Sequence, residues 1–186
     1  MKETFQYNEL LHRVWVIWHH TAELIIKCED TTFIEKTGLS HQQYVVLLIM
    51  ALNDEPTTAT HIAHHMSKNV NTLSTMLDRM ESKGLVKKVR DLVDRRSVSL
   101  VMTDEGKRKL QASTIAGWEL IEKLLSDFSE EELQSLIQLM EKMRKSTLKE
   151  LVPEGIPGKL VMENTPEEIE INNIHKLMRL LNNNKD

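Results

Sequence analysis

Apolar residues recur at spacings of three and four along most of the chain, which predicts a succession of amphipathic helices. A first long helix is expected from Phe5 to Glu29, and Gly38 marks a break after it. Ser40 followed by Gln43 has the spacing of a capping box, so a second helix should begin there and run to about Leu52. Because this helix is apolar on nearly every side, we expect it near the centre of the fold.

The next stretch predicts two helices joined by a tight turn. A short helix is expected from Thr58 to Met66, and Asn69 can cap a longer helix from Val70 to Lys83. Gly84 follows the longer helix, at a position where a left-handed residue commonly ends a helix. The pattern is typical of a helix-turn-helix whose second helix turns one apolar stripe inward.

After this point the period changes from helical to alternating. Two strands are expected, from Leu85 to Arg90 and from Ser97 to Met102, with a charged tip between them. Thr103 can cap a further helix that runs to about Leu125. Helix, turn, helix, β-hairpin and helix, in that order, predict a winged helix, a mainly α fold with a small β-hairpin wing.

Two more helices are expected towards the C-terminus. Ser129 and Glu132 form a second capping box and open a long helix. After a linker rich in Pro and Gly at 153–158, a last helix is expected from Thr165 to Leu181. We therefore divide the chain into an N-terminal dimerisation helix at 1–38, a winged helix-turn-helix DNA-binding domain at 39–110, dimerisation helices at 111–152, and a linker with an extra helix at 153–186.

Composition agrees with a mainly helical fold. Of the 186 residues 40% are hydrophobic but only 4% are aromatic, and ten are Met, so the core should be built from Leu, Ile and Met on helices. No stretch reaches the roughly 20 apolar residues that a membrane helix needs. Cys28 is the single cysteine and excludes an internal disulfide, so we expect a cytoplasmic protein without a membrane partner.

The charges are unevenly distributed along the chain. The net charge is −4, yet the segment from Met66 to Arg96 holds eight Lys and Arg against four Asp and Glu. A basic segment in an otherwise acidic protein can attract a polyanion to one face. On charge alone, a solvated charged surface explains the segment equally well.

The helix from Val70 to Lys83 carries residue types that read DNA. A helix enters the major groove through short polar or basic groups on its outward face, near its N-terminus. The candidates at this helix are Asn69, Asn71, Thr72, Ser74, Thr75 and Arg79. Taken by themselves, these residues are equally consistent with an ordinary polar helix face.

A compound motif extends across the hairpin. Asp94-Arg95-Arg96 stands at its tip, and Thr103 and Gly106 open the next helix. Here the chain resembles the MarR family, whose wing carries Asp, any residue and Arg, and whose next helix begins with Thr, two variable residues and Gly. The segments Asp78-Arg79-Met80-Glu81 and Lys83-Gly84-Leu85-Val86 also resemble the end of that family's recognition helix.

The resemblance covers about Leu39 to Leu110 and implies a sequence-specific DNA-binding transcription regulator, a repressor released by a small-molecule effector. The two recognition helices of a homodimer would read a pseudo-palindromic operator in double-stranded DNA. The resemblance assigns insertion into the minor groove to Arg96 or its neighbour Arg95, with Asp94 bracing the wing.

A pocket for a small aromatic ligand is implied by the same resemblance, because family members often bind such effectors beside the dimerisation helices. The candidates to line it are Trp15, Trp18, Tyr44 and Trp118. Ordinary core packing is the alternative for each of these residues.

Two other functions stay open at this point. A winged-helix protein-interaction module without DNA reading is supported by Lys68, where the family usually has an apolar residue, and by Val70, where a basic residue is common. A redox-sensing regulator could use Cys28, near the end of the first helix.

The sequence predicts neither a cofactor nor an enzyme. His61 and His65 are four residues apart, a spacing that can hold a metal, and His64 lies beside them. No Glu stands at the metalloprotease position and no Cys is near, so we expect imidazoles that face solvent or phosphate. A Gly-rich phosphate loop, a nucleophile elbow and carboxylates paired for catalysis are also absent from the sequence.

Overall fold

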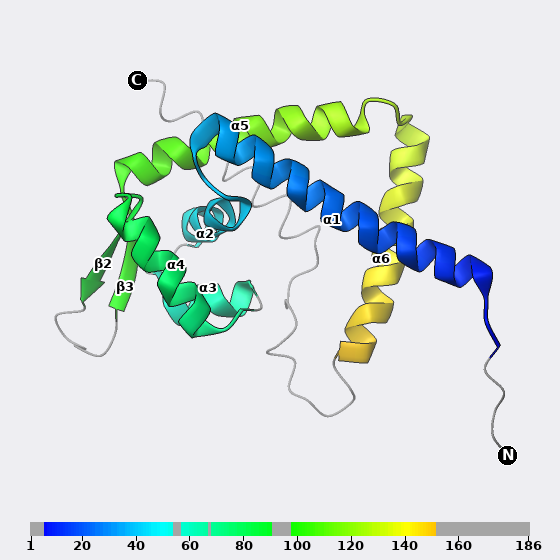
Figure 1. Ribbon diagram of the computed structural model, residues 1–186, viewed down its shortest axis with the longest axis horizontal. Coiled ribbons are helices and arrows are strands. Elements are labelled where there is room, and N and C mark those ends of the chain that lie inside the picture. The colour runs from blue at the N-terminus through cyan, green and yellow to red at the C-terminus, as the bar shows by residue number, and fades with distance from the viewer. Residues whose placement is uncertain (1–5, 54–56, 67, 91–97, 152–186) are drawn as a thin grey trace, which may run out of the picture.

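The computed structural model describes residues 6–53, 57–66, 68–90 and 98–151 as a mainly helical chain with a small sheet (Figure 1). The helix predicted from Thr165 to Leu181 lies outside the described residues. The helices are α1 (Glu9–Thr37), α2 (His41–Leu52), α3 (Ala59–His65), α4 (Val70–Ser82), α5 (Asp104–Leu125) and α6 (Glu130–Leu151). The strands are β1 (Thr57–Thr58), β2 (Val86–Arg90) and β3 (Val98–Met102).

The first helix begins and ends later than the predicted span from Phe5 to Glu29. Asn8 is its N-cap, and the Asn8 side chain accepts a hydrogen bond from the Leu11 amide at 3.0 Å. The helix continues to Thr37 because Phe33 and Thr37 are buried, and the Thr37 hydroxyl lies 2.8 Å from that of Ser113 on α5. Packing on α5 therefore stabilises the last turns of α1, and Gly38 ends the helix in a left-handed conformation, as the sequence predicts.

α2 is the central helix of the fold, as its apolar sequence predicts. Val46 and Leu47 are completely buried, and Figure 1 shows α2 end-on between α1 and α5 above and α3 and α4 below. We call the unit formed by α2, α3, α4 and the strands the winged lobe. The buried core of the winged lobe and its neighbours consists of Leu39, Val46, Leu47, Met50, Ile62, Ala63, Leu73, Leu77, Met80, Leu85, Val86, Leu100 and Leu110.

The sheet has one strand more than the sequence predicted. β2 and β3 pair antiparallel, with Arg90 opposite Val98, which confirms the hairpin strands. β1 adds to the other edge of β3, so the strand order is β1-β3-β2. Thr58, expected inside the short helix, ends β1 and caps α3 by accepting a hydrogen bond from the His61 amide at 3.2 Å. Two residues are too few to show an alternating pattern.

Thr103 and Gly106 fasten the start of α5 to the strands. The Thr103 hydroxyl lies 2.5 Å from the carbonyl oxygen of Gly84 and 3.1 Å from that of Leu85. The same hydroxyl accepts a hydrogen bond from the Gly106 amide at 3.0 Å. A Cβ atom at Gly106 would collide with the Leu85 carbonyl oxygen and lie 2.8 Å from Met102 Cγ. The motif therefore serves to bring α5 into close contact with the sheet.

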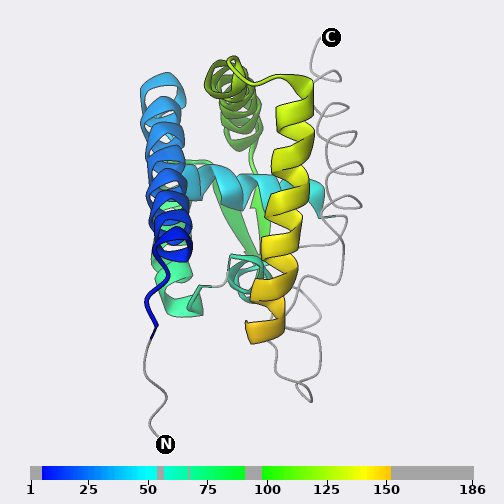
Figure 2. The same cartoon turned by 90° about the vertical axis from the view of Figure 1, so that its right-hand side faces the viewer.

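α5 and α6 extend beyond the winged lobe. The predicted capping box of α6 is present: the Ser129 amide donates to the Glu132 carboxylate at 2.9 Å, and the Glu132 amide donates to the Ser129 hydroxyl at 3.3 Å. Figure 2 shows α1 and α6 on opposite sides of the view, so the two helices only overlap in the projection of Figure 1 and do not touch where they cross there. Within the described ranges, no helix has both the length and the apolar character needed to cross a membrane.

Candidate nucleic-acid interface

α4 has one buried and one exposed face. Leu73, Leu77 and Met80 are buried at spacings of four and three, as the sequence predicts. Asn69 fixes the start of the helix, because its side chain accepts a hydrogen bond from the Asn71 amide at 2.8 Å. The polar face opposite the buried stripe is thus held towards solvent.

The structure divides the six helix residues predicted to read DNA. All except Ser74 are exposed; Ser74 is half-buried and its hydroxyl donates to the Val70 carbonyl at 2.9 Å. The Thr75 hydroxyl donates to the carbonyl of Asn71 at 3.3 Å. Within the described part of the chain, the side chains of Asn71, Thr72 and Arg79 form no hydrogen bond, so their polar groups are available to a ligand.

A surface hollow of about 480 Å³ lies between this face of α4 and the start of α2. Thr72, Thr75 and Arg79 line it from α4. Sequence reasoning did not place the start of α2 beside α4, because the two segments are distant in sequence and only packing brings them together. The start of α2 contributes Ser40, Gln42 and Gln43 to the hollow, and Lys68 lines it from just before α4.

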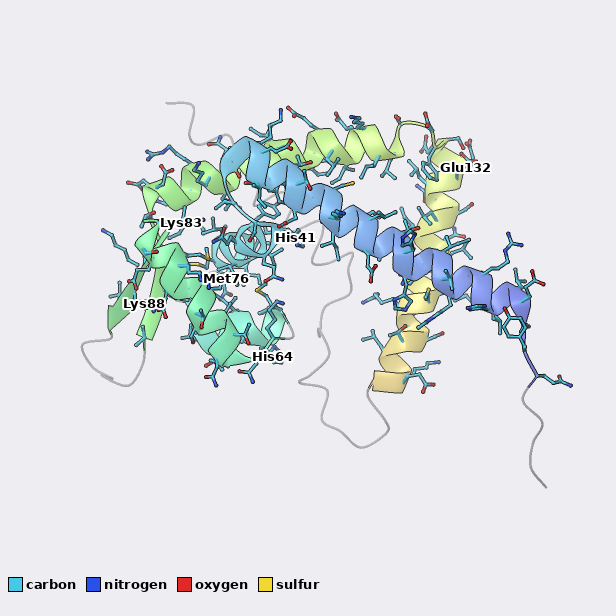
Figure 3. All side chains as sticks on the ribbon, viewed as in Figure 1. His41, His64, Met76, Lys83, Lys88 and Glu132 are labelled. Carbon is cyan, nitrogen blue, oxygen red and sulfur yellow. The ribbon has the colours of Figure 1, made fainter. Side chains whose placement is uncertain are left out.

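A second hollow, of about 510 Å³, adjoins the C-terminal half of α4. Arg79 lines both hollows, and Ser82 and Lys83 line the second. Met76 and Lys83, labelled in Figure 3, mark the course of α4 beside them. Arg79 and Lys83 therefore place positive charge next to two concave surfaces, an arrangement suited to phosphate groups.

Lys88 on β2 neutralises two acidic groups of α4. Its ammonium group forms an ion pair with Asp78 and lies 3.7 Å from the Glu81 carboxylate, and its amide donates to Glu81 at 2.9 Å. The hydrogen bond to Asp78 holds the pKa of Lys88 above its usual value. Arg79 and Lys83 form no ion pair with a described carboxylate, so the positive charge of α4 stays available to an anion.

The wing residues predicted to enter the minor groove lie outside the described residues. β2 ends at Arg90 and β3 begins at Val98, paired with each other, so the predicted hairpin has the strands that its tip requires. The tip itself holds Asp94, Arg95 and Arg96.

The aromatic residues proposed for an effector pocket fall into two groups. Tyr44 packs inside, with its ring centroid 4.7 Å from that of Phe33, and burial raises the pKa of its hydroxyl. Trp15 and Trp118 are 58% and 43% exposed on the outer surfaces of α1 and α5, and Trp18 is partly buried. Trp15 lies about 27 Å along α1 from Phe33, the ring that contacts Tyr44, so Trp15 is not beside Tyr44 in the single chain.

Cys28 is exposed on α1, so an oxidant can reach its thiol. Its role as a redox sensor stays a prediction. On α3, the rings of His61 and His65 are in contact with each other.

The packing of α3, α4 and the β2–β3 pair on α2 and α5 defines a winged helix-turn-helix protein, with α4 as the recognition helix. A model of the MarR family matches residues 39–98. The chain is 33% identical over 110 residues to transcriptional regulator HosA of Escherichia coli O157:H7, covering 59% of this chain and 80% of HosA. The chain therefore belongs to the MarR family and is a DNA-binding transcription regulator.

Solved structures show the same fold. The organohalide-sensing regulator RdhR-CbdbA1625, in its 2,4-dichlorophenol-bound form, is 19% identical with a TM-score of 0.67, covering 83% of this chain and 92% of that one. The MarR family regulator Sco3205 of Streptomyces coelicolor, in complex with DNA, is 20% identical with a TM-score of 0.67, covering 83% and 95%. These likenesses confirm the predicted mainly α fold with a winged helix-turn-helix.

Proposed function

We propose that the chain acts as a homodimer that binds a pseudo-palindromic operator and represses transcription until a small ligand releases it. The observation that carries this proposal is the outward face of α4, where Asn71, Thr72 and Arg79 are exposed beside a hollow. Such groups can reach base edges and phosphates, while Leu73 and Leu77 hold the helix on the core. A regulator of this kind acts where the DNA lies, which we expect to be the cytoplasm, and needs no catalytic group.

The wing supplies a second contact in this proposal. Arg96, or its neighbour Arg95, inserts into the minor groove next to the site read by α4, and Asp94 braces the tip. The antiparallel pairing of β2 and β3 supports this role, because residues 91–97 connect the paired ends of these two strands in sequence. The exposed Lys87 on β2 adds a positive charge on the same hairpin.

A homodimer is supported by apolar surface on α1, α5 and α6. Monomeric proteins rarely expose contiguous apolar patches of more than a few hundred Å². Large hydrophobic side chains on these helices are at least 36% exposed in the single chain, and a second copy would cover them. They are Leu10, Leu11, Val14, Trp15, Val16, Ile17, Leu24, Ile25, Ile26, Ile34, Ile115, Trp118, Ile121, Leu124, Leu125, Leu136, Ile137, Leu139 and Met140.

A small aromatic ligand is the effector class that we propose. The 2,4-dichlorophenol-bound form of RdhR-CbdbA1625 supports this class for a protein of the same fold. In this chain the ligand would lie between Tyr44 and tryptophans at the dimer surface, Trp15, Trp18 and Trp118. A partner subunit could bring the separated groups together.

Substitution of the wing arginine tests the DNA-binding proposal. Binding to DNA that flanks the chain's own gene should be measured by fluorescence anisotropy over a range of salt concentrations. Arg96→Ala should weaken binding and lower the salt slope by about 1 for each phosphate that the arginine neutralises. Lys142→Ala removes one charge from α6, outside the proposed interface, and should leave affinity and slope unchanged.

A protein-interaction module is the second candidate function. Val70 is 38% exposed at the start of α4, where an apolar group favours contact with protein. Folded wild-type protein that bound the flanking DNA without salt dependence, or not at all, would favour this function over operator binding.

A further inference from the structure

Two histidines of α3 bring their ring nitrogens together. His61 and His65 are four residues apart on one helix and so lie on the same side of it. Their Nε2 atoms are 3.1 Å apart, their ring centroids are 4.4 Å apart, and the ring planes are inclined by 64°.

Imidazole nitrogens at this distance can share a proton or bind one metal ion. In a pair of neutral rings, the Nε2–H of one ring can donate to the Nε2 of the other. Zn²⁺ and similar ions bind His nitrogens at about 2.0–2.1 Å. With the two Nε2 atoms 3.1 Å apart, the N–metal–N angle would be roughly 95–100°. This angle lies between the square-planar and tetrahedral values, so the spacing of the two nitrogens suits a single ion.

The other ring nitrogen of His61 is held by a polar partner. The side-chain amide nitrogen of Asn53, which follows the end of α2, lies 3.3 Å from His61 Nδ1. The oxygen and nitrogen of a carboxamide are interchangeable in such a structure, so Asn53 can accept the Nδ1–H bond. Metal-binding histidines are usually oriented by a partner of this kind, which leaves Nε2 free for the ion.

A third histidine lies beside the pair. The ring of His64 meets that of His65 edge-on, with centroids 6.1 Å apart, and His64 is labelled at the lower edge of the winged lobe in Figure 3.

We propose that His61 and His65 form a chelating site for a divalent first-row transition-metal cation, with Cu²⁺ bound most tightly. Imidazole ligands suit Cu²⁺, Ni²⁺ and Zn²⁺, and Cu²⁺ has the highest affinity in this series. No group of three or more His, Cys, Asp or Glu comes together among the described residues. Water therefore completes the coordination sphere, and the site is open to solvent.

Metal binding would stabilise the helix-turn-helix. Ile62 and Ala63 lie between the two ligands in sequence and are buried in the core that α3 shares with α4. A metal that bridges His61 and His65 ties together one turn of α3. Because the ligand geometry exists only in the folded chain, binding should raise the melting temperature.

The test uses the untagged full-length chain with Cys28→Ser as the background, since the exposed thiol can react with Cu²⁺. Electron paramagnetic resonance with substoichiometric Cu²⁺ should show two coordinated imidazole nitrogens. Competition titration should show that His61→Gln and His65→Gln each weaken Cu²⁺ affinity about tenfold or more, since even the loss of a partner behind a ligand costs that much. Zn²⁺ should raise the melting temperature of the background protein and not that of His65→Gln.

His20→Gln is the matched control, because His20 is an exposed histidine on α1, outside the pair. Its Cu²⁺ affinity should equal that of the background protein. His65 is exposed, so its substitution should leave the fold intact, which circular dichroism would verify. Equal Cu²⁺ affinity of the background protein and His65→Gln would overturn the proposal and assign the close contact to proton sharing. An equal loss in His20→Gln would overturn it in favour of non-specific binding.

Discussion

At Gly106 the backbone of α5 passes so near to β2 that a side chain cannot be accommodated without movement. The colliding group is the main-chain carbonyl of Leu85, which cannot rotate away as the end of a side chain could. We expect Gly106→Ala to lower the free energy of unfolding by about 1–3 kcal/mol through overpacking. Urea denaturation followed by circular dichroism measures this change.

Gly117 on the same helix provides the control for Gly106. A Cβ atom at Gly117 would lie 3.4 Å from two ring carbons of Phe33, which is ordinary contact. Gly117→Ala should therefore leave stability unchanged or increase it by up to about 1 kcal/mol through helix propensity. Equal destabilisation by both substitutions would show that the close approach at Gly106 is not the cause.

Lys88 gives a prediction about pH. Asp78 raises the pKa of Lys88 in the folded chain. The ion pair therefore stabilises the fold fully at pH values below the unfolded pKa of about 10.4. This stabilisation is lost as the pH rises through the folded pKa of Lys88. Lys88→Met should lower the free energy of unfolding by less than about 1 kcal/mol at pH 8, since the pair is partly exposed. The difference from wild type should decrease as the pH rises from 8 to 11.

Denaturation at both pH values checks the Lys88 prediction. Asp78→Asn removes the partner charge and should reproduce the loss at pH 8. A difference between wild type and Lys88→Met that was undiminished at pH 11 would assign the effect to the apolar stem of the lysine.

At the scale of the helix, we predict that α4 separates two tasks along its exposed face. Thr72 lies in the first turn of the helix and carries a short uncharged group, whereas Arg79 lies further along and carries a charge. Short groups near the N-terminus of a recognition helix reach base edges, and longer cations further along reach phosphates. The two residues should therefore affect DNA binding in different ways.

Paired substitutions on α4 check this separation. Thr72→Ala should change the preference among operator bases by about 1–3 kcal/mol per contacted base pair, without changing the salt slope. Arg79→Ala should weaken binding to all sequences alike and lower the slope by about 1 per phosphate contact. Selection from a randomised DNA library and salt titration measure the two effects. An unaltered preference in a folded Thr72→Ala protein would contradict base reading by Thr72.

At the scale of the whole molecule, the apolar faces of α1, α5 and α6 are exposed to solvent in the single chain. Leu11 and Trp15 on α1 are 66% and 58% exposed, so substitution there costs the single chain little packing. We expect Leu11→Lys combined with Trp15→Lys to give a folded monomer that no longer binds the operator tightly. Lysine in place of an apolar group at a dimer interface would bury unpaired charge.

Sedimentation at micromolar concentration measures the assembly of this double variant. Val101→Lys is the control, because Val101 is 50% exposed on β3 and lies outside the three helices. It should remain dimeric. A wild-type chain that sedimented as a monomer would contradict the homodimer itself.

The sequence by itself determined the local features of the fold. The capping box at Ser40 and Gln43, the N-cap at Asn69 and the buried stripe of α4 all depend on residues within one or two turns of each other. Such features depend on the intrinsic geometry of a helix, which a periodic pattern records directly. The motif of Thr103 and Gly106 was visible for the same reason, since its spacing is local.

The tertiary structure alone decided the features that join distant segments. The continuation of α1 past Glu29 depends on the burial of Phe33 and Thr37 against α5, and β1 exists because β3 offers a second edge. The ion pair of Lys88 with Asp78 and the contact of Asn53 with His61 also depend on packing between elements. The pattern of apolar and polar residues along the sequence does not show which segments pack together, because that packing depends on how the whole core is filled.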